Sequence, residues 1–562
     1  MEAKYWGAYA QTELGHGSNV RGLETQATFD AATDEFVIHS PTLSSMKWWP
    51  TGMYACTHAI VFCQLLLGDG SPSRGVFGFF VQLRDEHGDL MPGVEVGEIG
   101  PKVSAAECNI GYARFDRVRV PRSHLVAKHI KVSREGRFQA APPKLSRYKY
   151  IGMMNIRVML VRGASVACGK AATMAIRYSA VRRQGFLDSQ AANALASGEA
   201  AILDYGVQQR RLFTALGAAY LLLWTGRAVV SQLKEIVARV EDGDDGAADA
   251  LPEMHATCAG LKAHSTTWAA ALVEDCRKCC GGMGYLRSSG LADLSTSYVG
   301  SVTAEGEAVV LALQTARFLI KSVAQARRGE AVAGATAYVS DAPLPPQDVA
   351  RWGDRPGSSA RIGALVALHR DRARRVALEL ADDFDAATAS GLGFDAALNS
   401  VAVAGWHANE CHCAYVMAKN AQSAMPAVVK DEAARAALAT LLEFTLLQLV
   451  EEKGGDFAGA TLDTSQMRAV RLATNELQAL VRPDAVALCD SLGYSDAQLG
   501  HSTLGREDGQ VYEAIYDAAR RSPLNGTRMV GWDVLSPVVD MEFLRAGART
   551  QRQGNHAPPA KL

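Results

Sequence analysis

The chain has 562 residues, with 58 basic and 59 acidic side chains and a formal net charge of −1 at pH 7. At roughly 100 to 200 residues per domain this length predicts several domains, and the balanced charge gives no electrostatic reason to expect nucleic acid or an anionic membrane as a partner. Apolar runs such as 216–224 are shorter than the about 20 residues that span a bilayer, and no early segment looks like a secretory signal, so we expect no membrane span.

The first part of the chain predicts a β-domain over residues 1–135. Short stretches rich in β-branched and aromatic residues are separated by turns containing Asp, Gly and Pro, which is typical of strands. These stretches are 26–29, 36–39, 59–66, 76–83 and 114–120. Pro121 is expected to end the last strand, because proline has no N–H for further pairing.

The rest of the chain predicts helices, because apolar residues recur at helical spacing. The expected segments are 201–229, 261–279, 365–381, 396–419, 432–452, 465–481 and 511–521, with a further helix at 308–321. A first helical domain is assigned to residues 136–328, a linker rich in Gly, Ala and Pro to 329–346, a second helical domain to 347–545 and a tail to 546–562. The predicted fold class is α+β, a central β-domain followed by two mainly α-helical bundle domains.

Two motifs near the start indicate a flavin pocket. Residues 9–18 (YAQTELGHGS) form a polar, glycine-rich stretch, and residues 47–52 (KWWPTG) pair aromatic side chains with a glycine turn. Backbone groups in such turns can hold a flat, partly polar ring while an indole covers its edge. Two later motifs, 280–285 (CGGMGY) and 303–307 (TAEGE), strengthen this interpretation.

All four motifs, in this order, resemble the acyl-CoA oxidase and acyl-CoA dehydrogenase superfamily, and most closely the peroxisomal acyl-CoA oxidases. Segments 21–25, 176–184, 314–319 and 481–488 look like the oxidase branch, and the resemblance covers nearly the whole chain. It implies an FAD-dependent enzyme for the first step of peroxisomal fatty acid β-oxidation. The implied reaction converts acyl-CoA and O₂ to trans-2-enoyl-CoA and H₂O₂.

The resemblance identifies Glu305, which is directly followed by glycine, as the catalytic base that removes the α-proton. A positioned base contributes roughly 10²- to 10⁴-fold to the rate. An alternative is that Glu305 caps the helix 308–321, since carboxylates favour helix N-termini. Glu307 is the neighbouring candidate for the base, and we expect it to cap the helix or to face solvent.

The resemblance also places FAD contacts in the first two motifs, at Gln11, Thr12, Ser18, Trp49, Thr51 and Gly52. Gln11 and Thr12 match positions that hydrogen-bond the isoalloxazine ring, and Ser18 matches a position that contacts acyl-CoA or the flavin side chain. Thr51 departs from the oxidases, which commonly have glycine there, and resembles the dehydrogenases, whose threonine reaches flavin N5. Trp49 would pack against the ring, or alternatively lie in the core.

A third group of FAD contacts implies a homodimer. Arg182 lies where the family's arginine meets the FAD pyrophosphate, which suits a guanidinium. Gly281, Gly282 and Gly284 would let backbone amides approach the cofactor closely. In the family these groups reach the FAD of the neighbouring subunit. The neighbouring Arg177 and Arg183 could equally be solvated.

Other cofactor classes are disfavoured by the sequence. The stretch 15–17 lacks the third glycine of a dinucleotide-binding fingerprint. Eleven cysteines without a regular framework suggest reduced thiols. Two groups could bind a metal, namely Cys276, Cys279 and Cys280, and His407, Cys411, His412 and Cys413. Both lie in helical sequence without a second zinc-ligand pair, so no metal is predicted.

The two ends of the chain carry further expectations. The terminal tripeptide 560–562 (AKL) is a close variant of the Ser-Lys-Leu peroxisomal address, which predicts recognition by a peroxisomal import receptor. The family carries a helical domain ahead of the β-domain, and this chain begins only a few residues before the first motif, so we expect a truncated form or a differently built acyl pocket. The alternative functions are a dehydrogenase using an electron-transfer flavoprotein and a non-catalytic partner subunit.

Overall fold

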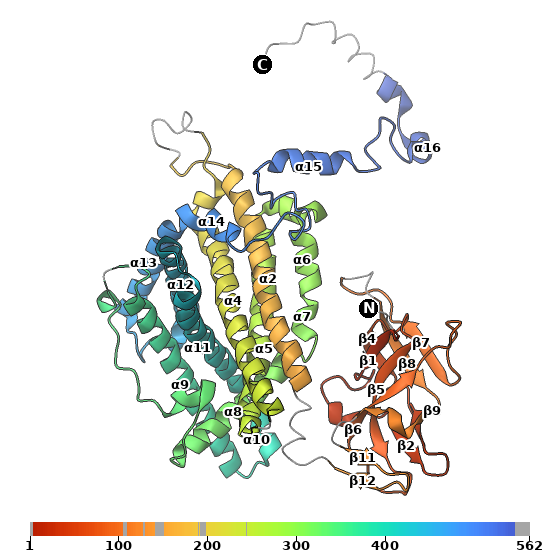
Figure 1. The fold of residues 1–562 in the computed structure, drawn as a ribbon. Helices are drawn as coiled ribbons and strands as arrows, with labels where there is room; N and C mark the ends of the chain where they lie inside the picture. Colours follow the sequence, from red (N-terminus) through yellow and green to blue (C-terminus); the bar gives the residue numbers. More distant parts are fainter. Residues whose placement is uncertain are drawn as a thin grey trace.

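The computed structural model describes residues 4–104, 109–126, 130–140, 151–188, 190, 198–242, 244, 246–353 and 355–545. An N-terminal β-domain lies beside a larger helical part, as the predicted fold class requires (Figure 1). The helices α2, α6 and α7 line the side of the helical part that faces the β-domain. The predicted tail, 546–562, lies outside the described residues.

The β-domain contains one large sheet and two smaller ones. The large sheet has the order β10-β6-β5-β2-β3-β9, and β1 pairs parallel to β5. Its strands are β1 (Gly7–Ala10), β2 (Gln26–Asp30), β3 (Glu35–His39), β5 (His58–Leu66), β6 (Val76–Gln82), β9 (Val118–Pro121) and β10 (Leu125–Val126). The smaller sheets contain β4 (Lys47–Thr51), β8 (Ile110–Phe115) and β7 (Val94–Glu98), and the pair β11 (Lys131–Val132) and β12 (Phe138–Gln139). Buried side chains alternate along β5, so one of its faces forms core.

Two details of the predicted strands were wrong. The expected strand 114–120 is interrupted at Arg117, whose φ of 53° turns the chain between β8 and β9. Pro121 is the last residue of the edge strand β9, where it is paired with Glu35, but β9 is not the last strand of the domain, because the chain continues into β10. An edge position tolerates proline, since no neighbour needs its missing N–H.

The helical part begins with long helices that follow the predicted periodicity. They are α2 (Ile151–Val181), α4 (Gly206–Glu241), α5 (Ala247–Cys279), α6 (Leu291–Tyr298), α7 (Gly300–Thr303) and α8 (Ala308–Arg327). The second set comprises α9 (Ser359–Ala389), α10 (Phe394–Ser400), α11 (Ala402–Val428), α12 (Glu432–Glu452), α13 (Thr464–Val481), α14 (Ala485–Asp490), α15 (Val511–Arg520) and α16 (Trp532–Leu535). Each predicted helix has a counterpart in these two sets.

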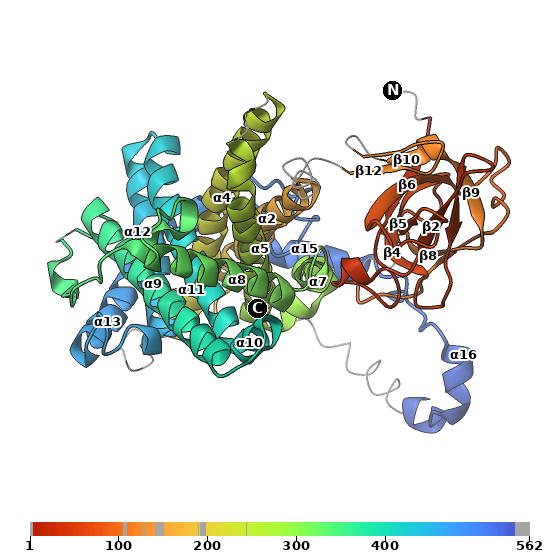
Figure 2. The same ribbon diagram turned by 90° about the horizontal axis from the view of Figure 1, so that it is seen from below.

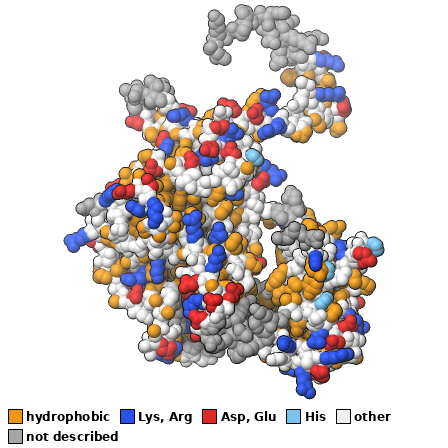
Figure 3. All heavy atoms as spheres, viewed as in Figure 1, with side chains coloured by type: hydrophobic (Ala, Val, Ile, Leu, Met, Phe, Trp, Pro, Cys, Tyr) orange, Lys and Arg blue, Asp and Glu red, His pale blue; other side chains and the backbone are white. Residues whose placement is uncertain are grey.

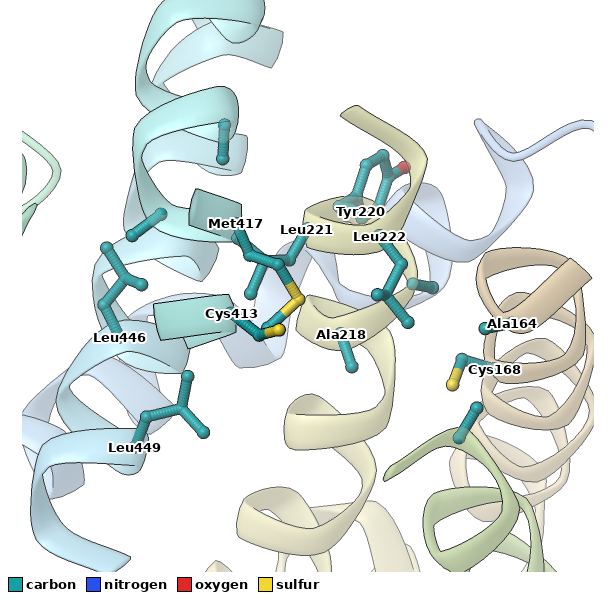
Figure 4. Packing of buried hydrophobic residues seen from close by; sticks show 14 of the residues in the cluster. Ala164, Cys168, Ala218, Tyr220, Leu221, Leu222, Cys413, Met417, Leu446 and Leu449 are labelled. Atoms are coloured by element: carbon teal, nitrogen blue, oxygen red, sulfur yellow. The ribbon is translucent and has the colours of Figure 1, made fainter. Parts of the chain in front are cut away.

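The two helical sets share one hydrophobic core. A single buried cluster extends from Met154 in α2 to Val511 in α15. Figure 4 shows α4 between α2 on one side and α11 and α12 on the other, with Cys168, Leu222, Met417 and Leu446 among its side chains. The backbones of α4 and α12 approach closely, because a Cβ at Gly217 would lie 1.8 Å from Thr445 Oγ1.

The stretch predicted as a linker takes part in this core. It contains the 3₁₀ helix η7 (Gly334–Ser340), in which Tyr338 is buried. The Tyr338 hydroxyl is hydrogen-bonded to His412 Nδ1 at 2.9 Å. The segment between the helical sets is therefore anchored against α11 rather than spanning open space.

Four helices, α2, α4, α8 and α12, are long and apolar enough to cross a membrane by length and composition. The expectation that apolar segments are too short to span a bilayer was therefore wrong, because it considered uninterrupted apolar runs only, and the absence of a membrane span stays a prediction. In the structure, 78% of the most apolar window of α4 and 67% of that of α12 are buried, against 44% for α2 and 50% for α8. Packing against neighbouring helices thus accounts for much of the apolar character of α4 and α12.

The described chain ends in a segment that projects from the helical part. Helix α15 begins at Val511, which is buried in the shared core, whereas α16 extends away from the main body in both views (Figures 1 and 2). Several apolar side chains there are largely exposed, among them Val534, Val538 and Phe543.

Candidate active site

Glu305 lies on a tight turn between α7 and α8. Its φ is 58°, and that of the following Gly306 is 109°. A Cβ at Gly306 would lie 2.7 Å from Leu311 Cδ2, so both the conformation and the space there favour glycine. A bulky residue with positive φ is strained, and such strain clusters at functional sites. The turn thus has the features of a site held in place for chemistry.

Glu307, not Glu305, caps helix α8. The Glu307 carboxylate accepts the backbone N–H groups of Val309 and Val310, at 2.8 and 3.2 Å. The alternative that Glu305 is the cap is therefore wrong, and the expectation that Glu307 is the cap is confirmed. Because the N–H groups at the start of α8 are satisfied by Glu307, the exposed Glu305 side chain is free for another role.

The turn that carries Glu305 lies near Tyr9 in β1. Partial loss of water around the Tyr9 hydroxyl and the nearby Glu305 carboxylate raise the pKa of the phenol to about 12, although 57% of the residue is exposed. The Tyr9 hydroxyl donates to Gln11 Oε1. The first motif and the TAEGE motif, far apart in sequence, thus meet in space. Tyr9 lies in the first motif, but no role was predicted for it from the sequence. The available signal was its place two residues before Gln11, because residues two apart in an extended chain point to the same side.

A buried ion pair holds the first flavin motif against the second. Glu13 and Lys47 are both buried, and Lys47 Nζ lies 2.9 Å from Glu13 Oε1. Lys47 Nζ also donates to the carbonyls of Gln11 and Phe62, at 3.2 and 2.6 Å. Burial alone would raise the pKa of Glu13, but the Lys47 ammonium together with hydrogen bonds from Thr25 and the Glu24 N–H lowers it. Sequence reasoning missed this pair, although each residue lies inside a motif it singled out.

The second flavin motif presents an exposed indole. Trp49 has a φ of 78° and is 55% exposed, so the alternative that it is a core residue is wrong. Its neighbour Trp48 instead stacks on Tyr112, with ring centroids 5.8 Å apart. The register of β4 shifts between Trp48 and Thr51, and this irregularity turns Trp49 outward.

The remaining positions of the two motifs border the same surface. The Thr12 carbonyl accepts the Trp48 N–H at 2.9 Å, which joins the motifs. Gly52 has a φ of 81°, and its N–H donates to the Asn109 carbonyl at 2.5 Å. Ser18 and Thr51 are exposed. Hydrophobic side chains gather on the face of the β-domain that Figure 3 shows, and the exposed large hydrophobic residues of this domain include Tyr9, Trp49 and Tyr54.

Arg182 and the glycine motif lie far from Glu305. Lys262, whose ammonium donates to the Gly306 carbonyl next to Glu305, lies in the middle of α5, and from Lys262 to Cys279 at the C-terminal end of α5 the helix rises about 25 Å at 1.5 Å per residue. Arg182 follows the end of α2, and its Nη2 donates to Gln184 Oε1 at 3.2 Å. One protomer therefore does not bring these residues to Glu305.

The three glycines of this motif differ in their surroundings. Gly281 and Gly282 are exposed, and an added Cβ at either would meet nothing within 4 Å, so their backbone is open to a ligand. Gly284 is buried, and a Cβ there would lie 2.1 Å from the Arg277 carbonyl oxygen. Close packing against α5 explains the glycine at position 284 without a ligand.

The two groups of candidate metal ligands have different surroundings in the structure. Cys276, Cys279 and Cys280 are buried, and burial raises the pKa of Cys279 to about 12, which disfavours the thiolate that binds metals. In the second group, His412 is bonded to Tyr338 and Cys413 Sγ donates to Asn409 Oδ1.

His407 and Cys411 of that group instead meet Asp456, with ligand atoms within 4.8 Å of one another. The Arg372 guanidinium lies 2.6 Å from Asp456 Oδ2. This positive charge already pairs with the carboxylate and would repel a cation. The absence of a metal stays a prediction.

Three family models match the chain in order. They are "Acyl-CoA dehydrogenase, middle domain" over residues 8–118, "Acyl-CoA oxidase, C-alpha1 domain" over 150–320 and "Acyl-CoA oxidase" over 362–540. Peroxisomal acyl-coenzyme A oxidase 1 of Rattus norvegicus is 38% identical over 537 residues, covering 94% of this chain and 78% of the relative. The chain belongs to the acyl-CoA oxidase family. The Homo sapiens enzyme of the same name is also 38% identical to this chain over 527 residues, covering 92% of this chain and 77% of the relative.

Solved oxidase structures share the fold. Arabidopsis thaliana acyl-CoA oxidase 1 has a TM-score of 0.85 at 35% identity, covering 94% of this chain and 78% of the other. Acyl-CoA oxidase-1 of Caenorhabditis elegans, complexed with FAD and ATP, has a TM-score of 0.87 at 30% identity, covering 95% and 78%. The predicted family, fold class and enzyme class are confirmed: this chain is an acyl-CoA oxidase. The predicted domain boundaries and site residues stay predictions.

Proposed function

We propose that this oxidase converts acyl-CoA and O₂ to trans-2-enoyl-CoA and H₂O₂, with Glu305 taking the α-proton. The observation that carries the assignment is the turn between α7 and α8, where Glu307 caps the helix and leaves Glu305 exposed opposite Tyr9. A carboxylate held on a strained turn, facing the strand that begins the flavin motif, suits proton removal next to a ring. The exposed Trp49 belongs to the second motif, which is joined to the first by the hydrogen bond from the Trp48 N–H to the Thr12 carbonyl.

The described residues fit FAD. Trp49 offers an exposed indole, and Gln11, Thr12, Thr51 and Gly52 border it with polar groups and backbone. When bound, FAD accepts the hydride from the β-carbon and passes the electrons to O₂. The protein side of the reaction belongs to Glu305, which holds the α-proton, and to the two motifs, which orient the reacting carbons and exclude water.

We further propose a homodimer in which FAD sites are shared. Arg182 and the open backbone of Gly281 and Gly282 lie far along the bundle from Glu305 in the same protomer, so they are available to a cofactor held by a second copy. The guanidinium suits a pyrophosphate, and the glycines suit close backbone approach. Ser18, exposed at the end of the first motif, would contact acyl-CoA or the flavin side chain.

A peroxisomal setting is supported by the relatives, which are named peroxisomal oxidases. We propose that an import receptor recognises residues 560–562, which lie outside the described residues. A dehydrogenase that uses an electron-transfer flavoprotein is less well supported, because residues 362–540 match the "Acyl-CoA oxidase" model. A non-catalytic partner subunit would lack flavin, so the visible absorbance of the purified chain separates it from an enzyme.

The test is Glu305→Gln, assayed in an oxygen electrode over a series of acyl-CoA chain lengths. The amide keeps the shape of the side chain but cannot accept the proton, so flavin absorbance should persist and turnover should fall by about 10²- to 10⁴-fold. Glu307→Gln is the matched control, since it alters the cap and should keep most of the activity. A Glu305→Gln rate above about a tenth of wild type would move the base elsewhere.

A further inference from the structure

Lys262 lies in α5 directly beneath the turn that carries Glu305. Its side chain is fully buried. Its ammonium donates to the carbonyl oxygens of Val302 and Gly306, at 2.9 and 2.7 Å. These two carbonyls flank residues 303–305, so a single side chain holds both ends of the turn.

A lysine at this position is costly for stability alone. Removing an ammonium from water costs several kcal/mol, and a well-packed apolar side chain is often at least as stable. Both acceptors that the described residues supply to Lys262 are backbone carbonyls rather than a carboxylate. Burial and the neighbouring Arg157 guanidinium, itself buried, lower the pKa of Lys262 to about 8. The carboxylates of Glu305 and Glu307 act in the opposite direction. Because its desolvation is costly, the buried ammonium of Lys262 is expected to have a role other than packing.

The backbone conformation of the turn above Lys262 must be stabilised by contacts with other residues. Glu305 and Gly306 both have positive φ, and for the non-glycine Glu305 this is a strained conformation that persists only when its surroundings determine it. A small apolar cluster secures one side, where Val302 packs against residues that include Ala259, Ala263 and Leu311. Lys262 lies on α5 between Ala259 and Ala263 and supplies the polar hold.

We propose that Lys262 is a positioning residue for the catalytic base, holding the Val302 and Gly306 carbonyls so that the Glu305 carboxylate stays within reach of the substrate α-carbon. This inference rests on the proposed role of Glu305. Lys262 itself is buried and exchanges no proton with the substrate. Its contribution is geometric, and a displacement of about 1 Å in a reacting group can cost about 10²-fold in rate.

The experiment compares Lys262→Met with wild type as full-length, FAD-loaded enzyme. Anaerobic stopped-flow mixing with acyl-CoA measures flavin reduction per bound flavin, and α-deuterated acyl-CoA reports the proton-removal step. We expect reduction about 10- to 100-fold slower, an increased deuterium isotope effect, a reduced kcat and a KM close to wild type. Val323→Ala, a core truncation in α8 distant from the turn, is the matched control. This truncation should lower stability but leave the rate of flavin reduction and the deuterium isotope effect unchanged.

The outcomes separate this proposal from the assignment of the base. A Lys262→Met reduction rate within about twofold of wild type, beside an inactive Glu305→Gln, overturns the positioning role and leaves the base in place. An active Glu305→Gln overturns both. If Lys262→Met does not fold, Lys262→Gln replaces it. Its amide is one bond shorter and cannot hold both carbonyls, so we expect flavin reduction at least about fivefold slower than wild type, and a wild-type rate again overturns the proposal.

Discussion

The buried pair of Glu13 and Lys47 should control the local stability of the flavin motifs, and Glu13→Gln tests this. Glu13 accepts hydrogen bonds from the Glu24 N–H at 2.7 Å, from the N–H and hydroxyl of Thr25 at 2.9 and 2.6 Å, and from Lys47 Nζ at 2.9 Å. The glutamine carbonyl can replace only part of this set. The substitution also leaves the Lys47 ammonium buried without its carboxylate.

The expected magnitude follows from that unpaired charge. Removing one partner of a buried ion pair costs about 3–5 kcal/mol. At about 1.4 kcal/mol per factor of ten, the equilibrium constant for local opening should rise by about 10²- to 10³-fold or slightly more. The effect should be confined to the β-domain, because the helical part has its own core.

Native-state hydrogen exchange measures this opening. The reporting amides are those of Leu14, Gly15 and Trp48, which donate to the carbonyls of Met46, Ser44 and Thr12 and so join residues 12–15 to residues 44–48. Adding Lys47→Met to Glu13→Gln removes the unpaired charge, so the double variant should exchange more slowly than the single one. Exchange of the single variant within about threefold of wild type would refute the reasoning, as would a double variant no slower than the single.

Three further outcomes are expected. Arg182→Ala should lower flavin content and weaken the dimer together, as measured by gel filtration with flavin absorbance; a fully flavinated dimer would make Arg182 a surface charge only. Deleting residues 560–562 should leave an N-terminally tagged enzyme active but outside peroxisomes in fluorescence imaging, whereas persistent peroxisomal puncta would require another signal. Because the folded-state pKa of Glu13 is lowered from its ordinary 4.5, its contribution to β-domain stability should be full above pH 4.5 and lost as the pH falls through the lower folded pKa. Acid titration of the unfolding midpoint measures this, and the dependence should be weaker in Glu13→Gln, because other β-domain carboxylates such as Asp30 and Asp34 also have lowered pKa values.

Local patterns in the sequence determined most of the secondary structure and the enzyme family. Helix α12 coincides with the predicted segment, because an apolar helix of this length has a clear period and clear ends. The strands β1, β4 and β7 were not predicted, since they are short and contain Gly or Pro. Glu305 was identified from its motif and not from its spacing. Local rules cannot distinguish two glutamates that lie beside the start of the same helix.

Only the tertiary structure decided which glutamate caps α8, which tryptophan is exposed, and what lies beneath the base turn. Each answer depends on backbone dihedrals or on contacts between distant segments, such as the φ of Trp49 or the reach of Lys262 to Gly306. The shared core of the two helical sets is of the same kind, because periodicity shows that a helix has an apolar face but not which helix covers it. Sequence patterns record the preferences of neighbouring residues, whereas the site is built where segments hundreds of residues apart pack together.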